Sequence, residues 1–121
     1  MSPRLTRLGL WAPPLLLMGA IFALSSVPGS SLGRVPMDKL LHGIEYAALG
    51  AALARALAGG VARVDRGAAL AAWGLATVYG ASDELHQSLV PGREMSGFDL
   101  AADATGALAA VTVLLWLRRR A

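Results

Sequence analysis

The sequence predicts an all-α integral membrane protein, a four-helix bundle with both termini in the cytoplasm. Of its 121 residues, 55% are hydrophobic and 16% are charged, fewer polar residues than the surface of a soluble domain needs. Apolar stretches of membrane-spanning length recur along the chain. Basic and acidic residues collect at opposite ends of these stretches. The length suits one domain covering residues 1–121.

The first predicted span covers residues 8–27, which carry no charge and match the roughly 20 residues that cross the hydrocarbon core. Pro13 and Pro14 lie within its first two turns and predict a kink. The alternative is a secretory signal peptide, with Arg4 and Arg7 before the apolar run and small residues near its end. The run is long for a signal peptide, and cleavage would leave an odd number of spans, so we favour a membrane span.

The second predicted span covers residues 38–57 and follows a connection rich in proline, glycine and serine. Pro36 precedes the helix, and Asp38 is a favourable residue at a helix start. Gly59 and Gly60 predict its end.

The third and fourth predicted spans cover residues 67–89 and 98–117. The third is uncharged from Ala68 to Ser82 and acidic in its last turns, before a turn predicted at Pro91-Gly92-Arg93. The fourth begins with two aspartates, becomes apolar, and stops at three arginines.

Charge decides the predicted topology. Eight of the eleven basic residues would lie on one side: Arg4, Arg7, Arg55, Arg63, Arg66, Arg118, Arg119 and Arg120. The positive-inside rule makes this side cytoplasmic, so we expect a multi-pass membrane protein. Seven of the eight acidic residues would lie on the outer side: Asp38, Glu45, Asp83, Glu84, Glu94, Asp99 and Asp103. We therefore expect three helix ends to build an acidic pocket that opens outward.

Helical spacing selects the candidate ligand-binding residues. Asp38, His42 and Tyr46 are four residues apart and share a helix face. An ordinary interfacial helix start explains a capping Asp38 and a snorkelling Lys39, but not His42 and Glu45, which lie deeper. The full candidate set is Asp38, Lys39, His42, Glu45, Tyr46, Glu84, Gln87, Arg93, Asp99 and Asp103.

Several of these residues have a simpler alternative role. Asp99 can cap a helix after Ser96 and Gly97. Arg93 can be a plain loop charge, a counter-ion for the acids, or a bidentate ligand for phosphate. His86 falls on a different helix face from Glu84 and is assigned to the membrane interface. We assign Gly50, Gly80 and Gly106 to close helix packing.

Crowded carboxylates need protons, basic side chains or a metal ion to balance their charge. Oxygen ligands with one histidine suit a divalent ion such as Mg²⁺, Mn²⁺, Ca²⁺ or Zn²⁺. The metal and catalytic candidates are the same four residues: His42, Glu84, Asp99 and Asp103. The chain has no cysteine, no P-loop and no HExxH motif. Its net charge of +3 does not indicate a nucleic-acid partner, because the arginines flank apolar stretches.

An ordered set of short motifs resembles the VanZ-like family of small bacterial membrane proteins. The motifs are Asp38-Lys39-x-x-His42-x-x-x-Tyr46, Asp83-Glu84-x-x-Gln87, Pro91-Gly92-Arg93 and Asp99-x-x-x-Asp103-x-x-Gly106. The chain departs from the family at Asp103, where asparagine is more common. The resemblance implies a multi-pass protein of the bacterial inner membrane that is associated with the envelope. Teicoplanin resistance is known for the family's named member.

Three functions fit these observations. The first is binding of a membrane lipid or lipid-linked envelope precursor by its headgroup, which would modulate the envelope and teicoplanin susceptibility. The second is hydrolysis of a lipid phosphate or lipid-linked headgroup, with or without a metal ion. The third is a proton- or ion-coupled carrier, which the nearly apolar inner halves of the spans disfavour. The ligand and the oligomeric state are left open.

Overall fold

The structure is a computed structural model that describes residues 2–28, 38–94 and 96–120, with the backbone alone described at 38, 39, 119 and 120. It contains four long helices: α1 (Pro3–Ser25), α3 (Asp38–Ala58), α4 (Arg66–Gln87) and α5 (Gly97–Arg120). A short 3-10 helix, η1 (Val61–Arg63), joins α3 to α4, and no strand occurs among the described residues. The prediction of an all-α chain with four helices is therefore confirmed. The predicted connection that contains Arg34 and Pro36 lies outside the described residues.

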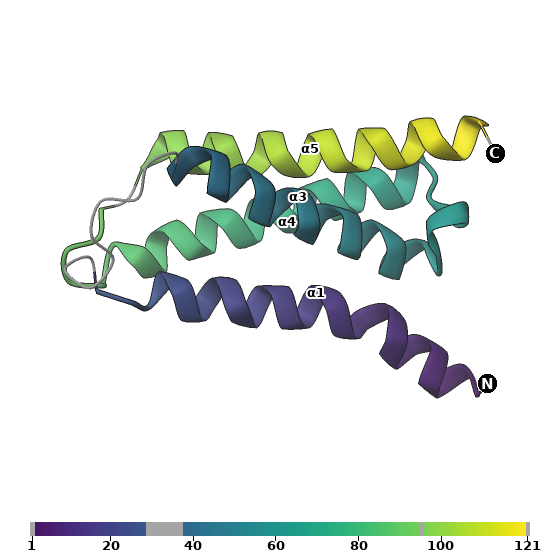
Figure 1. Cartoon of the computed structure of the whole chain (residues 1–121), viewed down its shortest axis with the longest axis horizontal. Helices are drawn as coiled ribbons and strands as arrows, with labels where there is room; N and C mark the ends of the chain where they lie inside the picture. The colour runs from purple at the N-terminus through teal and green to yellow at the C-terminus, as the bar shows by residue number, and fades with distance from the viewer. Residues whose placement is uncertain (1, 29–37, 95, 121) are drawn as a thin grey trace.

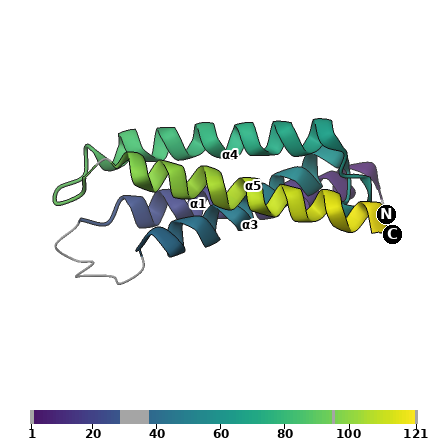
Figure 2. The same ribbon diagram turned by 90° about the horizontal axis from the view of Figure 1, so that it is seen from above.

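The four helices run along one axis, and the two ends of the chain lie at the same end of the bundle (Figures 1 and 2). This arrangement agrees with the expected topology, but which side of the membrane the ends face stays a prediction. Within the described part of the chain, two helices are long and apolar enough to cross a membrane, Pro3–Ser25 and Gly97–Arg118. Over its described length, α4 carries buried Asp83 and Glu84, which lower its apolar character.

Helix α1 begins before the predicted span because Pro3 fits the first helical position and Ser2 caps it. The Ser2 hydroxyl accepts a hydrogen bond from the Leu5 N–H at 3.3 Å. Pro13 and Pro14 lie inside the helix, and the N-terminal part of α1 bends away from the other helices in Figure 1.

Turns at both ends of α4 use the residue types that the chain geometry requires. Gly59 and Gly60 follow α3 with φ of 82° and 144°, values that favour glycine. The Asp65 carboxylate then caps α4 by accepting the Ala68 N–H at 2.8 Å. Gly92, with φ of 73°, forms the turn between α4 and α5.

Helix α3 is the centre of the bundle, because it packs against α1, α4 and α5. Small residues let the helices approach closely: a Cβ atom on Gly50 would lie 3.0 Å from the Ala107 Cα atom. Tyr46 and Leu49 are fully buried beside them. Large apolar side chains such as Leu16, Leu70 and Val78 face outward, as expected for contact with lipid.

Candidate functional site

The centre of the candidate site is a buried pair between α3 and α5. The Nδ1 atom of His42 lies 2.9 Å from Oδ1 of Asp103. Asp103 is fully buried and His42 is 7% exposed. An ionised carboxylate in such a position needs a partner that carries positive charge or donates hydrogen bonds. The pair therefore places a histidine and an acid in a polar core at the level where α3 and α5 begin.

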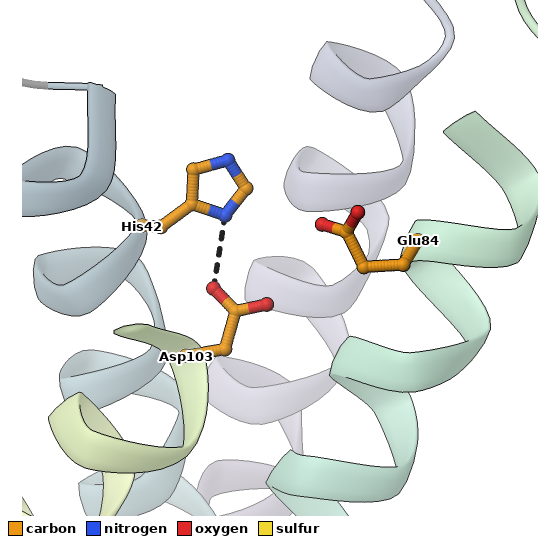
Figure 3. A group of neighbouring side chains, drawn as sticks. All are labelled: His42, Glu84 and Asp103. Carbon is orange, nitrogen blue, oxygen red and sulfur yellow. Dashed lines mark hydrogen bonds and ion pairs between the residues drawn. The ribbon is translucent and has the colours of Figure 1, made fainter. Parts of the chain in front are cut away.

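Glu84 brings a second carboxylate to this pair from the last turn of α4 (Figure 3). Its Oε2 atom accepts the backbone N–H of Ser96 at 2.9 Å, so the turn before α5 fixes the side chain. Its Oε1 atom is buried without a hydrogen-bond partner among the described residues. Figure 3 shows the carboxylate directed toward His42 and Asp103.

Asp99 approaches the other nitrogen of the same imidazole ring. Its Oδ2 atom lies 3.9 Å from Nε2 of His42, and the residue is 7% exposed. Its backbone N–H donates a hydrogen bond to the Ser96 hydroxyl oxygen at 3.3 Å. Ser96, not Asp99, therefore supplies the side-chain cap at the start of α5, and the Asp99 carboxylate faces the histidine instead.

Three of these residues offer the donor atoms of a cation site. One donor atom each from His42, Glu84 and Asp103 lie within 4.8 Å of one another, and all three residues are buried. Two of the carboxylate oxygens, Oε1 of Glu84 and Oδ2 of Asp103, are buried without a hydrogen-bond partner among the described residues. Unpaired buried oxygens are unusual because they cost free energy. One imidazole with two carboxylates is a donor set that fits Mn²⁺, Mg²⁺ or Zn²⁺.

A second polar layer lies beside the donor atoms, deeper in the bundle. The Tyr46 hydroxyl and Oδ2 of Asp83 are both buried without a hydrogen-bond partner among the described residues. The rings of Tyr46 and Tyr79 are 6.4 Å apart. Gly80 leaves room for the acid, because a Cβ atom there would lie 3.1 Å from Oδ2 of Asp103. The assignment of Gly80 to close packing is confirmed.

Other predicted residues lie at the contact between α1 and the rest of the bundle. Gln87 is buried and donates from Nε2 to the Ser25 hydroxyl at 3.2 Å. Arg93 donates from Nη1 to the backbone carbonyls of Leu24 and Val27, at 3.2 and 3.0 Å. Arg93 therefore satisfies carbonyl groups at the end of α1, a structural role that the sequence did not suggest.

Glu45 is half-buried on α3. The side chains of Asp38 and Lys39 lie outside the described part of the chain, so their predicted roles stay predictions. The four metal and catalytic candidates come together in one cluster, and their assignment as site residues also stays a prediction. All four residues are buried, and the outward-opening pocket expected from the sequence stays a prediction.

Sequence reasoning missed the partners that hold the cluster in place. Ser96 contacts both Glu84 and Asp99, yet its only signal in the sequence is its position before a helix start. His86 was assigned to the interface, and it stacks on Phe22 with ring centroids 4.5 Å apart. Its Nε2 atom lies 3.4 Å from the Ser26 hydroxyl, so it is also part of the contact with α1.

A sequence model of the VanZ/LLP1 family matches residues 8–118, nearly the whole chain. The chain belongs to the VanZ/LLP1 family. No curated protein and no solved structure matches this VanZ/LLP1 chain.

Family membership fixes the general class of the protein. A VanZ/LLP1 chain is a membrane protein linked to the cell envelope or to glycopeptide resistance, and the two long apolar helices agree with a membrane location. The family match includes every residue of the buried cluster, from His42 to Asp103.

Proposed function

We propose that this VanZ/LLP1 protein binds a divalent cation at His42, Glu84 and Asp103, and through it the phosphate headgroup of an envelope lipid or lipid-linked precursor. The observation that carries the proposal is a pair of buried oxygens, Oε1 of Glu84 and Oδ2 of Asp103, beside the imidazole of His42. Neither oxygen has a hydrogen-bond partner among the residues that the structure describes. A cation would satisfy both oxygens at once and would neutralise acids that crowd in a buried site.

The donor count supports a cation that also binds a ligand. Three protein donors leave coordination positions open for other oxygen atoms. Phosphate oxygens commonly complete the shell of such ions, and carboxylates alone would repel a phosphate. Asp103 lies six residues into α5, about 9 Å from its start, a depth near the headgroup boundary of a leaflet.

Cation binding is the first test. Purified protein in nanodiscs is stripped with a chelator and titrated with Mn²⁺, and bound ion is counted by electron paramagnetic resonance. We expect one ion for each chain in the natural sequence and a loss of at least tenfold in affinity for Glu84→Gln. Glu94→Gln is the matched control, because Glu94 is an exposed acid of the neighbouring turn. Equal binding by both variants would contradict the proposal.

Headgroup binding is the second test. Nanodiscs with a lipid phosphate added to phosphatidylcholine are analysed by native mass spectrometry, with Mn²⁺ and with a chelator. We expect the protein to retain the lipid phosphate only when Mn²⁺ is present and only when Glu84 is unchanged. Teicoplanin susceptibility of cells expressing each variant then reports whether the envelope effect follows the same residues.

Catalysis is the second candidate function. It is favoured by the His42 ring, which has a carboxylate near each nitrogen, Asp103 at 2.9 Å and Asp99 at 3.9 Å. Such flanking acids orient an imidazole for proton transfer, and a bound cation can activate water. Release of free phosphate from a lipid phosphate, lost in His42→Gln, would establish hydrolysis. Retained lipid without release would leave binding as the function.

A further inference from the structure

A second candidate site lies at the opposite end of the bundle, where α4 begins and α5 ends. A cavity of about 450 Å³ is lined there by Asp65, Arg66, Gly67, Leu115 and Arg118. None of these residues belongs to the buried cluster of His42, Glu84, Asp99 and Asp103. The two arginines outnumber the single aspartate, and the Asp65 carboxylate already accepts the Ala68 N–H as the cap of α4.

The arginines keep hydrogen-bond donors for a ligand. Arg118 donates from Nη1 to the Val64 carbonyl at 3.0 Å, and this bond holds its guanidinium group at the cavity. A guanidinium group has five N–H donors, so one bond leaves most of them for an anion. Arg66 is exposed and forms no ion pair with the described residues.

An apolar groove continues from this cavity along α4 and α5. It has a volume of about 250 Å³ and shares Arg66 and Leu115 with the first cavity. Its other lining residues are Ala69, Leu70, Trp73, Leu108, Val111 and Thr112. The indole N–H of Trp73 is satisfied by the Ala104 carbonyl at 3.1 Å, so this residue needs no polar ligand. The groove therefore suits a hydrocarbon chain.

We infer that this end of the bundle binds an anionic phospholipid, with its phosphate at Arg66 and Arg118 and one acyl chain in the groove between α4 and α5. A soluble anion would use only the charged part of this surface. A phospholipid uses both parts in the order in which the membrane presents them, charge at the interface and apolar surface below it. The site is separate from the proposed cation site and does not depend on it.

Lipid retention tests the charged part. The full chain in vesicles of phosphatidylcholine with a minor fraction of phosphatidylglycerol is extracted and analysed by native mass spectrometry. We expect phosphatidylglycerol to be retained in preference to phosphatidylcholine, and Arg66→Gln to weaken retention about fivefold. Arg63→Gln is the matched control, because Arg63 is exposed at the same end and lines neither cavity. Unchanged retention in Arg66→Gln, or an equal loss in both variants, would overturn the inference.

Fluorescence quenching tests the apolar part and separates a lipid from free phosphate. Trp73 is the reporter, in a background where Trp11 and Trp116 are replaced by phenylalanine. We expect phosphatidylglycerol with brominated acyl chains to quench Trp73 more than brominated phosphatidylcholine does, and Thr112→Leu to reduce this difference by filling the groove. Excess inorganic phosphate should leave the difference unchanged. If inorganic phosphate abolishes the difference, or if both lipids quench equally, the site does not bind phospholipid as inferred.

Discussion

Gly43 and Gly106 lie against each other where α3 crosses α5, so closely that a Cβ atom on Gly106 would lie 2.1 Å from the carbonyl oxygen of Gly43. His42 precedes one of these glycines, and Asp103 lies three residues before the other. The crossing therefore determines how closely the histidine and the aspartate can approach. This contact confirms the assignment of Gly106 to close packing.

Gly106→Ala should separate the two helices. A methyl group has no space there, and overpacking typically costs about 1–3 kcal/mol. We expect a lower midpoint in thermal unfolding of the detergent-solubilised protein, together with weaker Mn²⁺ binding. Gly74→Ala is the control, because no atom lies within 4 Å of the added Cβ position. Equal effects of the two substitutions would show that the crossing is not tightly constrained.

His42→Ala should destabilise the protein more than Asp103→Asn does. Removing the imidazole leaves the fully buried Asp103 without its hydrogen-bond partner, which costs about 3–5 kcal/mol when the acid is charged. Asparagine keeps a hydrogen-bond acceptor for the histidine and removes the charge, so we expect Asp103→Asn to lower the free energy of unfolding by no more than about 1 kcal/mol. Denaturant unfolding in mixed micelles measures both. A larger loss for Asp103→Asn would mean that the charge itself holds the helices together.

Gly80→Ala should weaken cation binding with little change in stability. The added methyl group would lie 3.1 Å from Oδ2 of Asp103, one of the unpartnered oxygens. Displacing this oxygen by a few tenths of an ångström disturbs the donor set. We expect about tenfold weaker Mn²⁺ binding, a loss typical of disturbed metal ligands. Unchanged affinity would indicate that Oδ2 of Asp103 is not a ligand.

Arg93→Lys should loosen the end of α1 although it keeps the charge. The guanidinium group contacts two carbonyls, those of Leu24 and Val27, and an ammonium group does not reproduce this planar geometry. We expect faster hydrogen exchange of the last turn of α1 and a loss of about 1–2 kcal/mol. If hydrogen exchange in Arg93→Lys were as slow as in the natural protein, the role of Arg93 would depend on charge alone, as expected for a ligand contact.

Two single-cysteine variants should be labelled from opposite sides of the membrane. The natural chain has no cysteine, so no background substitution is needed. We expect an impermeant maleimide to label Glu94→Cys in intact cells and Ala62→Cys only after permeabilisation. Both residues are exposed; Ala62 belongs to η1, between α3 and α4, and Glu94 to the connection between α4 and α5, and these two connections lie at opposite ends of the bundle (Figure 1). The reverse pattern would place the termini outside the cytoplasm.

The helices could be predicted closely because each has a local signal at its ends. The predicted start at Asp38 and the end before Gly59 agree with α3. The largest difference between a predicted span and its helix lies at the start of α1, because Arg4 and Arg7 precede the apolar run but lie inside the helix. Helix formation depends on backbone hydrogen bonds and caps, here Ser2 and Pro3, which hydropathy does not measure.

The cluster could be predicted in part, since polar residues four apart on apolar helices must face inward. This argument selected His42 and Asp103 but could not give their distance, which depends on the contact between Gly43 and Gly106. The partners of Arg93 could not be predicted from the sequence either, because the path of the turn relative to α1 depends on how the helices pack.

The position of both chain ends at one end of the bundle has a practical consequence for counting subunits. The end of one copy can be joined to the start of a second by a linker that never has to cross the bilayer. Such a tandem can carry an intact cluster in one half and Glu84→Gln in the other. Its bound-ion count and its effect on cells would then reveal whether one cluster suffices or whether two copies must act together.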